Sequence, residues 1–361
     1  MGQYFRLIAP RRREVLSWHG KLGEILFDGS ASELVTLFAR PVLPLNDTEE
    51  EPENKAVAVQ GAVVPQKRRR ESGSEPSHSQ EYQQEKAARC RLLEVPAEIK
   101  YIIFDFLNIQ DVFLLGITCQ QLWAMTKPIF QRHFAAYLGT WAGTPIVCAG
   151  DETDRGRDAA YPHGLLSKDD LDELHEGLDV EELEHDLEEY AEKPVNLFSI
   201  AHARYDFTEG YISFPQDLLG IALDCKRPYP EDRLRVANPR PSSFYPPDQE
   251  WVLRNLTTQE FVRPTAIASN EKYISGPYIR VLGYGEVILS RICWSTSDST
   301  SMCWEGIHQG VWAGHALDIV PSTYLDRGGP WKDISDDVAM DIAEIWKSEY
   351  GDDWRNILSK N

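Results

Sequence analysis

The sequence lacks any apolar run long enough to cross a membrane. Its richest stretch, 101–118, is interrupted by Asp105, Asn108, Gln110 and Asp111, whereas a spanning helix needs about 20 predominantly apolar residues. The amino terminus is rich in arginine but is not followed by the apolar segment that a secretory signal requires. We therefore expect an intracellular, cytoplasmic protein that has no membrane partner.

Signatures of metal and cofactor chemistry are also missing. Cysteine occurs six times, with no Cys-x-x-Cys pair and no histidine at ligand spacing, which is typical of reduced, buried thiols rather than of a zinc site. The phosphate-binding loop, the dinucleotide-binding glycine motif, the esterase elbow and the zinc-protease motif are absent. His308 and His315 lie near Glu305, but no further ligands follow at regular spacing. We therefore expect no metal, no cofactor and no enzymatic activity.

Positive charge is scarce. The chain has 57 acidic and 37 basic residues, a net charge of −20 and a pI of about 4.9. Nucleic acids are bound largely through positive charge that neutralises their phosphates, and anionic membrane surfaces attract the same charge. The composition therefore disfavours both of these partners and leaves other proteins.

The sequence does contain enough apolar material for folded domains. Hydrophobic residues make up 42% and aromatic residues 11% of 361 residues, a length that suggests roughly two to three domains. Short β-like runs mixed with helical patterns predict an α+β fold. The predicted parts are an amino-terminal α/β element (1–45), a disordered linker (46–90), a small helical motif (91–135) and a mixed α+β body with short strands (136–361).

The predicted linker is rich in Glu, Pro, Gln, Ser and Arg and poor in large apolar residues. Such a segment buries too little surface to offset the entropy cost of ordering it. Within it, Lys67, Arg68, Arg69 and Arg70 form a basic cluster of the kind that nuclear import receptors bind. A solubilising charge run explains the same four residues equally well.

The body contains three local patterns. Residues 165–193 hold 13 acidic residues against two lysines. Leucines at spacings of three and four predict two short amphipathic helices or one broken helix in a solvated acidic insertion; docking of a basic partner is the alternative. Residues 278–282 and 286–292 predict two strands joined by a tight turn. Apolar residues at helical spacing around 338–346 predict a final helix.

A tripeptide occurs twice in the chain. Trp141-Ala142-Gly143 and Trp312-Ala313-Gly314 both lead into apolar runs. Two interpretations stay open: an internal pseudo-repeat, or a tight turn that is used twice to start a strand beside a tryptophan.

The strongest pattern lies in residues 93–123. Pro96 suits the first position of a helix, because its missing N–H needs no partner there. The apolar residues that follow at helical spacing are Ile99, Ile102, Ile103, Phe106 and Leu107. Asp111 is placed to cap a second short helix. About 40 residues with this many large apolar side chains cannot bury them all within themselves, so part of this stripe needs a partner.

This order of residues resembles the F-box, the motif by which substrate receptors join cullin-RING ubiquitin ligases. The similarity includes a proline followed by Glu98-Ile99, an aspartate before the second helix, then Cys119 and Leu122-Trp123. It departs at Val95, where an F-box usually has leucine, and Trp123 falls slightly late. The residues that the resemblance places against a Skp-type adaptor are Leu93, Val95, Pro96, Ile99, Ile103, Leu107, Leu114 and Leu115.

The resemblance implies a non-catalytic substrate receptor or adaptor of a Skp-cullin-F-box type ubiquitin ligase. Its partners would be the Skp-type adaptor, the cullin scaffold and a target protein that the sequence does not identify. The alternative is an interaction or structural protein whose helical motif packs on its own body, with no ligase role. A small-molecule enzyme with an unrecognised site is a third possibility.

A looser resemblance spans more of the chain. Met1-Gly2-Gln3-Tyr4, residues 20–24 and the two Trp-Ala-Gly tripeptides are similar to landmarks of fungal proteins that carry an F-box between an amino-terminal element and a larger body. This similarity implies an architecture and no activity.

Overall fold

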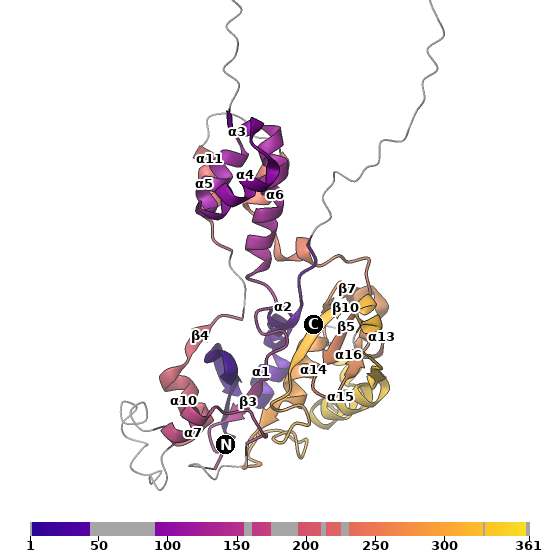
Figure 1. Ribbon diagram of the computed structural model, residues 1–361. Coiled ribbons are helices and arrows are strands. Elements are labelled where there is room, and N and C mark those ends of the chain that lie inside the picture. Colours follow the sequence, from indigo (N-terminus) through magenta and orange to yellow (C-terminus); the bar gives the residue numbers. More distant parts are fainter. Residues whose placement is uncertain are drawn as a thin grey trace, which may run out of the picture.

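The computed structural model describes residues 2–43, 91–154, 161–174, 194–210, 214–224, 231–327 and 329–358. Its architecture is mixed α+β, which confirms the predicted fold class. Figure 1 shows a body that contains the sheets and, above it, a lobe made of helices. The predicted linker with Lys67–Arg70, and residues 175–193 of the acidic insertion, lie outside the described residues.

The first sheet has five strands in the order β4-β2-β1-β3-β9. These strands are β1 (Tyr4–Ala9), β2 (Glu14–Lys21), β3 (Val147–Gly150), β4 (Asp206–Thr208) and β9 (Cys293–Trp294). β1 pairs antiparallel with β2 and β3, whereas β4 and β9 run parallel to their neighbours β2 and β3. The amino-terminal element therefore supplies inner strands of a sheet that later parts of the chain complete on both sides.

The second sheet has four strands in the order β10-β5-β6-β11. These strands are β5 (Trp251–Asn255), β6 (Glu260–Val262), β10 (Leu317–Pro321) and β11 (Lys332–Asp333). β5 pairs antiparallel with β6 and β10, and β11 runs parallel to β6. The order β11-β6-β5-β10 thus repeats the strand directions and connections of β4-β2-β1-β3. A small separate ladder joins β7 (Ile274–Ser275) and β8 (Tyr278–Ile279).

The hairpins of the two sheets share their turn geometry. Arg13 and Gln259, each directly before the second strand, have left-handed backbone conformations with φ of 54° and 57°. In each sheet the carbonyl of this residue accepts the N–H of the first residue of the outer parallel strand, Asp206 over 2.8 Å and Lys332 over 2.9 Å. Positive φ is uncommon outside glycine, so this agreement indicates that one structural unit occurs twice.

The Trp-Ala-Gly tripeptides occupy matching places in the two units, shortly before β3 and β10. Gly143 and Gly314 have φ of 81° and 79°, a conformation that favours glycine. The Gly143 N–H donates to the Leu317 carbonyl over 2.8 Å, and the Gly314 N–H donates to the Ile146 carbonyl over 2.7 Å. Each acceptor lies three residues after the glycine of the other turn. The tripeptide is therefore both a recurrent tight turn and a marker of an internal repeat.

A matching helix follows each hairpin. These helices are α1 (Leu22–Phe27) and α14 (Tyr284–Arg291). The N–H of the preceding residue donates to a glutamate in the first turn, from Lys21 to Glu24 over 3.1 Å and from Gly283 to Glu286 over 2.9 Å. The strand predicted over 286–292 is therefore wrong. Almost all of α14 is buried, and a short apolar run without polar alternation has the same pattern in a strand and in a helix.

The helical lobe is an insertion in the first unit. Its helices are α3 (Arg91–Glu94), α4 (Ala97–Asp105), α5 (Ile109–Gly116) and α6 (Gln120–Ala135). They follow α2 (Leu34–Phe38), and the second unit has only residues 295–309 at the matching place. Where the insertion returns to the body, the Gly139 N–H donates to the Thr36 carbonyl over 2.8 Å. The two ends of the insertion therefore lie side by side.

The connection between the two units also contributes to the lobe. It forms α11 (Asp217–Asp224) and α12 (Glu231–Ala237), which pack on α5 and α6 respectively. Figure 1 shows α11 beside α5 and shows α6 running from the lobe toward the body. The chain thus leaves the body twice to build the lobe.

Helices cover the remaining faces of the sheets. Those of the body are α7 (Lys168–Glu173), α10 (Leu197–Arg204), α13 (Pro264–Ile267), α15 (Ser335–Tyr350) and α16 (Trp354–Leu358). The 3-10 turns are Pro10–Arg12, Ser30–Glu33, Pro241–Phe244, Glu271–Tyr273 and Ser322–Asp326. α15 confirms the final helix that was predicted from apolar spacing. Among the described residues, no helix combines the length and the apolar content that a bilayer crossing demands.

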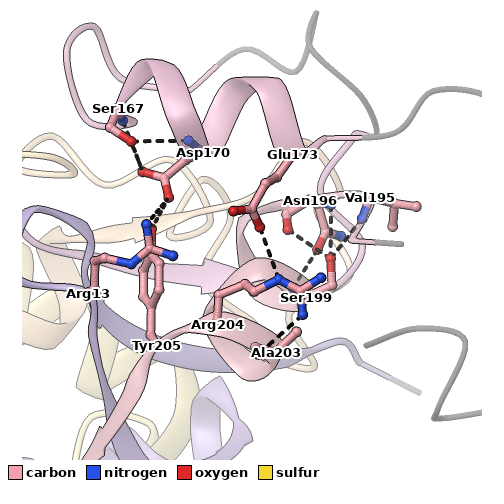
Figure 2. Close-up of polar contacts among 10 residues, drawn as sticks. All are labelled: Arg13, Ser167, Asp170, Glu173, Val195, Asn196, Ser199, Ala203, Arg204 and Tyr205. Atoms are coloured by element: carbon pink, nitrogen blue, oxygen red, sulfur yellow. Dashed lines mark hydrogen bonds and ion pairs between the residues drawn. The ribbon is translucent and has the colours of Figure 1, made fainter. Parts of the chain in front are cut away.

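The first residues of the predicted acidic insertion form helix α7. Figure 2 shows α7 fixed through Asp170, which exchanges hydrogen bonds with Ser167 and accepts one from the Tyr205 hydroxyl over 2.9 Å. Asp170 is only 2% exposed. Lys168, Asp169, Leu171 and Asp172 are exposed, whereas Asp170 and the neighbouring Leu174 are buried. The helix is therefore largely solvated and is fixed to the body through its buried residues.

Candidate protein-docking surface

Residues that favour helix starts directly precede α4 and α5, close to the starts predicted from the sequence. Pro96 directly precedes α4. Asn108, and not Asp111 as predicted, caps α5: its side-chain oxygen accepts the Asp111 N–H, and its amide donates to the Asp111 carboxylate, both over 2.8 Å. Asp111 instead lies in the first turn of α5, where its negative charge suits the helix dipole.

The inner side of the lobe is an aromatic cluster between α5 and α6. The rings of Phe113, Trp123 and Phe130 are buried, and their centroids lie 5.5–6.1 Å apart. Gly116 permits close contact of the helices, because a Cβ there would lie 2.2 Å from the Thr126 hydroxyl oxygen. This packing positions α5 firmly on α6.

Helix α12 closes the inner side of the lobe. The Arg233 guanidinium lies 5.5 Å from the centre of the Trp123 ring and donates to the Ile117 carbonyl over 3.0 Å. A guanidinium over an aromatic ring and a cation at the end of a helix are both favourable. The protein's own chain therefore covers this side of the motif.

Part of the lobe remains exposed, and we call its exposed large apolar residues the outer face: Ile99 and Ile102 of α4, Phe106 directly after α4, and Leu114 of α5. Their exposed fractions are 45%, 51%, 86% and 44%. Ile99, Ile102 and Phe106 recur at intervals of three and four, which places them on one side of α4. Several large apolar side chains exposed on one side of a helix are typical of a protein-docking surface.

None of the eight residues predicted to contact an adaptor is buried. Pro96, Ile99 and Leu114 are exposed. The half-buried ones are Leu93, Val95, Ile103, Leu107 and Leu115. Ile102 and Phe106 were not among the predicted contacts, although both belong to the same apolar stripe. Their intervals along α4 relative to Ile99 were the signal that could have identified them.

Acidic side chains accompany the outer-face residues along α3, α4 and α5. Glu94, Glu98, Asp105 and Asp111 are exposed. Lys100 of α4 is only 3% exposed, and its ammonium donates to the Leu93 carbonyl over 3.0 Å. The exposed charges next to these apolar residues in the sequence are thus mostly negative, which suits a partner that carries positive charge beside its apolar contact.

The histidines considered for metal binding have other surroundings. His315 Nδ1 lies 2.9 Å from the Asn255 side-chain amide, and His308 contributes its carbonyl to the Ser295 N–H over 2.7 Å. In the part of the chain that the structure describes, no three histidine, cysteine or acidic side chains come together as a metal site would require.

Comparison of the chain with protein-family models, with curated proteins and with solved structures gave no match. The likeness of the lobe to an F-box therefore depends on the residues quoted above.

Proposed function

We propose that the chain is a non-catalytic substrate receptor or adaptor of a Skp-cullin-F-box type ubiquitin ligase. The observation that supports this proposal most is the open outer face on a lobe whose inner side is closed by α12. A Skp-type adaptor that carries the cullin scaffold would cover the outer face. The body would then present a target protein.

Such a receptor supplies position rather than chemical groups. A bound target is held near a ubiquitin-conjugating enzyme, so that a lysine of the target reacts at a high effective concentration. The alternative is an interaction or structural protein whose motif packs on its own body. That alternative is favoured by the contacts of α11 and α12, but it requires a further segment to cover the outer face.

Adaptor binding by an outer-face variant tests the proposal. In the double variant Ile99→Ala, Phe106→Asp, affinity for a purified Skp-type adaptor should fall by about a hundredfold or more, since an interface anchor contributes about 2 kcal/mol or more. The melting temperature should change little, because both side chains are exposed in the free protein.

Phe207→Asp is the matched control, because Phe207 is 56% exposed on β4 in the body. This variant should bind the adaptor like the unmodified protein. Failure of the unmodified chain to bind any Skp-type adaptor would refute the receptor proposal. A large loss of thermal stability in the double variant would instead support packing of the motif on its own body.

We also propose that the protein is intracellular and that Lys67–Arg70 direct part of it to the nucleus. Replacement of these four residues with alanine should shift a fluorescently tagged chain to the cytoplasm. An unchanged distribution would leave the basic cluster as a solubilising charge run.

A further inference from the structure

A groove of about 730 Å³ opens where the lobe joins the body. Residues of α11 and α12 form one wall, and residues 238–243 form the other. The volume falls within the usual range of about 300–1,000 Å³ for ligand sites. The groove lies away from the outer face and was not among the sites suggested by the sequence.

Leucines form the apolar part of the groove. Leu219 and Leu234 are half-buried, and Leu223 is 68% exposed, more than any other leucine among the described residues. Contact between an exposed leucine and an apolar ligand side chain is favourable, because it removes apolar surface from water. The groove therefore has an unused anchor position for an apolar side chain.

The charged side chains among the described residues of the lining are two arginines, of which Arg235 already has an interaction partner, so that Arg240 is the one offered to a ligand. Arg235 and Arg240 are exposed in its lining, together with Asn238, Ser242 and Ser243, and no acidic side chain among the described residues lines it. This is unusual in a chain with 57 acidic and 37 basic residues. Arginine presents a planar fork of donors that matches a carboxylate. An anionic ligand is therefore favoured here over the rest of the surface.

The combination of groups fits a peptide better than a nucleic acid. Among the described residues of the lining, none is an aromatic residue on which a base could stack, and two arginines neutralise few phosphates. An extended peptide can place a leucine-like side chain on Leu223 and a neighbouring carboxylate on Arg240. Alternating apolar and charged contacts of this kind are common in peptide recognition.

Both walls of the groove are anchored. Arg233 fixes α12 to α5 and α6 through Ile117 and Trp123. On the other side, Phe244 is 1% exposed in the core, and its carbonyl accepts the Val42 N–H over 2.9 Å. The site therefore exists before a ligand arrives, which lowers the entropy cost of binding.

We propose that this groove binds a short peptide segment that carries an acidic residue beside a leucine-sized apolar residue. The peptide would belong to the target protein, so this inference names the target class of the receptor and rests on the function proposed above. It places the target at the junction of the lobe and the body.

The test is selection of a phage-displayed library of random dodecapeptides on the immobilised full chain. We expect enriched peptides in which aspartate or glutamate adjoins leucine, isoleucine, methionine or phenylalanine. Synthetic, fluorescein-labelled copies should bind Leu223→Ser and Arg240→Glu variants about tenfold more weakly or worse. Binding to Arg280→Glu, a charge reversal at an exposed arginine of the body, should be unchanged.

Absence of enrichment, enrichment of basic peptides, or equal binding by the two groove variants would overturn the proposal. Adaptor affinity, measured on the same proteins, distinguishes failure of the groove proposal from failure of the proposed receptor function. Adaptor binding without peptide selection would reject the groove alone. Peptide selection without adaptor binding would retain the groove and reject the ligase role.

Discussion

Two glutamates make the same backbone contact in different surroundings. Glu24 and Glu286 each accept the N–H of the residue before their helix, but Glu24 is exposed and Glu286 is only 4% exposed. Burial raises the pKa of Glu286 from 4.5 to about 7, against the lowering effect of its backbone hydrogen bonds. The same capping glutamate thus lies at the surface in the first unit and in the core in the second.

The raised pKa of Glu286 predicts a loss of stability with rising pH. Between 4.5 and about 7 the folded chain keeps a proton that the unfolded chain has released, so the free energy of unfolding falls as pH increases. Glu286→Gln keeps an acceptor for the Gly283 N–H but does not ionise. Between pH 5.5 and 8.5 it should gain about 2 kcal/mol relative to the unmodified protein.

Urea unfolding at the two pH values measures this difference. Glu24→Gln is the control, because it makes the same substitution at the exposed counterpart of Glu286. Parallel pH profiles for Glu286→Gln and the unmodified chain would show that the buried carboxyl does not titrate in this range.

Among the elements, α1 and α14 show how matched helices tolerate different changes. Gly285 of α14 packs on the 3-10 turn Ser30–Glu33, and a Cβ there would lie 1.8 Å from the Ala31 carbonyl oxygen. A Cβ on Gly23 of α1 would make only ordinary contacts, with the Met302 side chain at 3.5 Å and the Phe27 ring at 3.9 Å. The same residue type is therefore a packing requirement in one helix only.

Gly285→Ala should destabilise the protein by about 3 kcal/mol or more, since backbone must move to accept the methyl group. Gly23→Ala should be neutral or stabilising by up to about 1 kcal/mol, because alanine has the higher helix propensity. Thermal unfolding of the two variants measures the contrast. Equal melting temperatures would mean that α14 does not pack on this turn as described.

Elements with one apolar face could be predicted, and fully buried elements could not. The periods of α4 and α15 are visible in the sequence because their other faces are polar. The internal repeat cannot be recognised in the sequence, because matching positions of the two units carry chemically different residues. Val147 of β3 pairs with Ile8 of β1. At the matching place in the second unit, Asp318 of β10 pairs with Arg254 of β5, and the two side chains form an ion pair over 2.9 Å. The long insertion also separates the hairpin from its Trp-Ala-Gly turn in the first unit.

The docking surface was predictable only in part for a similar reason. The apolar stripe of α4 follows from spacing, and the resemblance to an F-box assigns it a partner. Which members of the stripe stay exposed depends on where the rest of the chain packs. Helices α11 and α12, which close the inner side, come from a connection far along the sequence and carry no local signal of that role.

At the scale of the whole molecule, the amino-terminal element depends on the rest of the chain. β1 lies between β2 and β3, and its residues Phe5, Leu7 and Ile8 have no exposed surface. Limited trypsin digestion should cut first in residues 46–90, whose composition predicts disorder and which contain several lysines and arginines. The two fragments should nevertheless stay together.

Size-exclusion chromatography of the nicked protein measures this association. Co-elution of the amino-terminal fragment with the rest is expected until denaturant unfolds the body. Separation of the fragments in native buffer would mean that the pairing of β1 with β3 contributes little, and first cleavage within 91–135 would contradict the division into linker and lobe.

The reciprocal bonding of the two Trp-Ala-Gly turns gives the body two matching places, shortly before β3 and shortly before β10, and the lobe is inserted at the first of them. The other is the segment 295–309, where Gly306 has φ of 86° and open space around it. A chain engineered with a second copy of the whole lobe at this turn, α11 and α12 included, would present two outer faces. Such a chain would bind a surface coated with the adaptor by avidity, with a residence time that far exceeds that of either face alone.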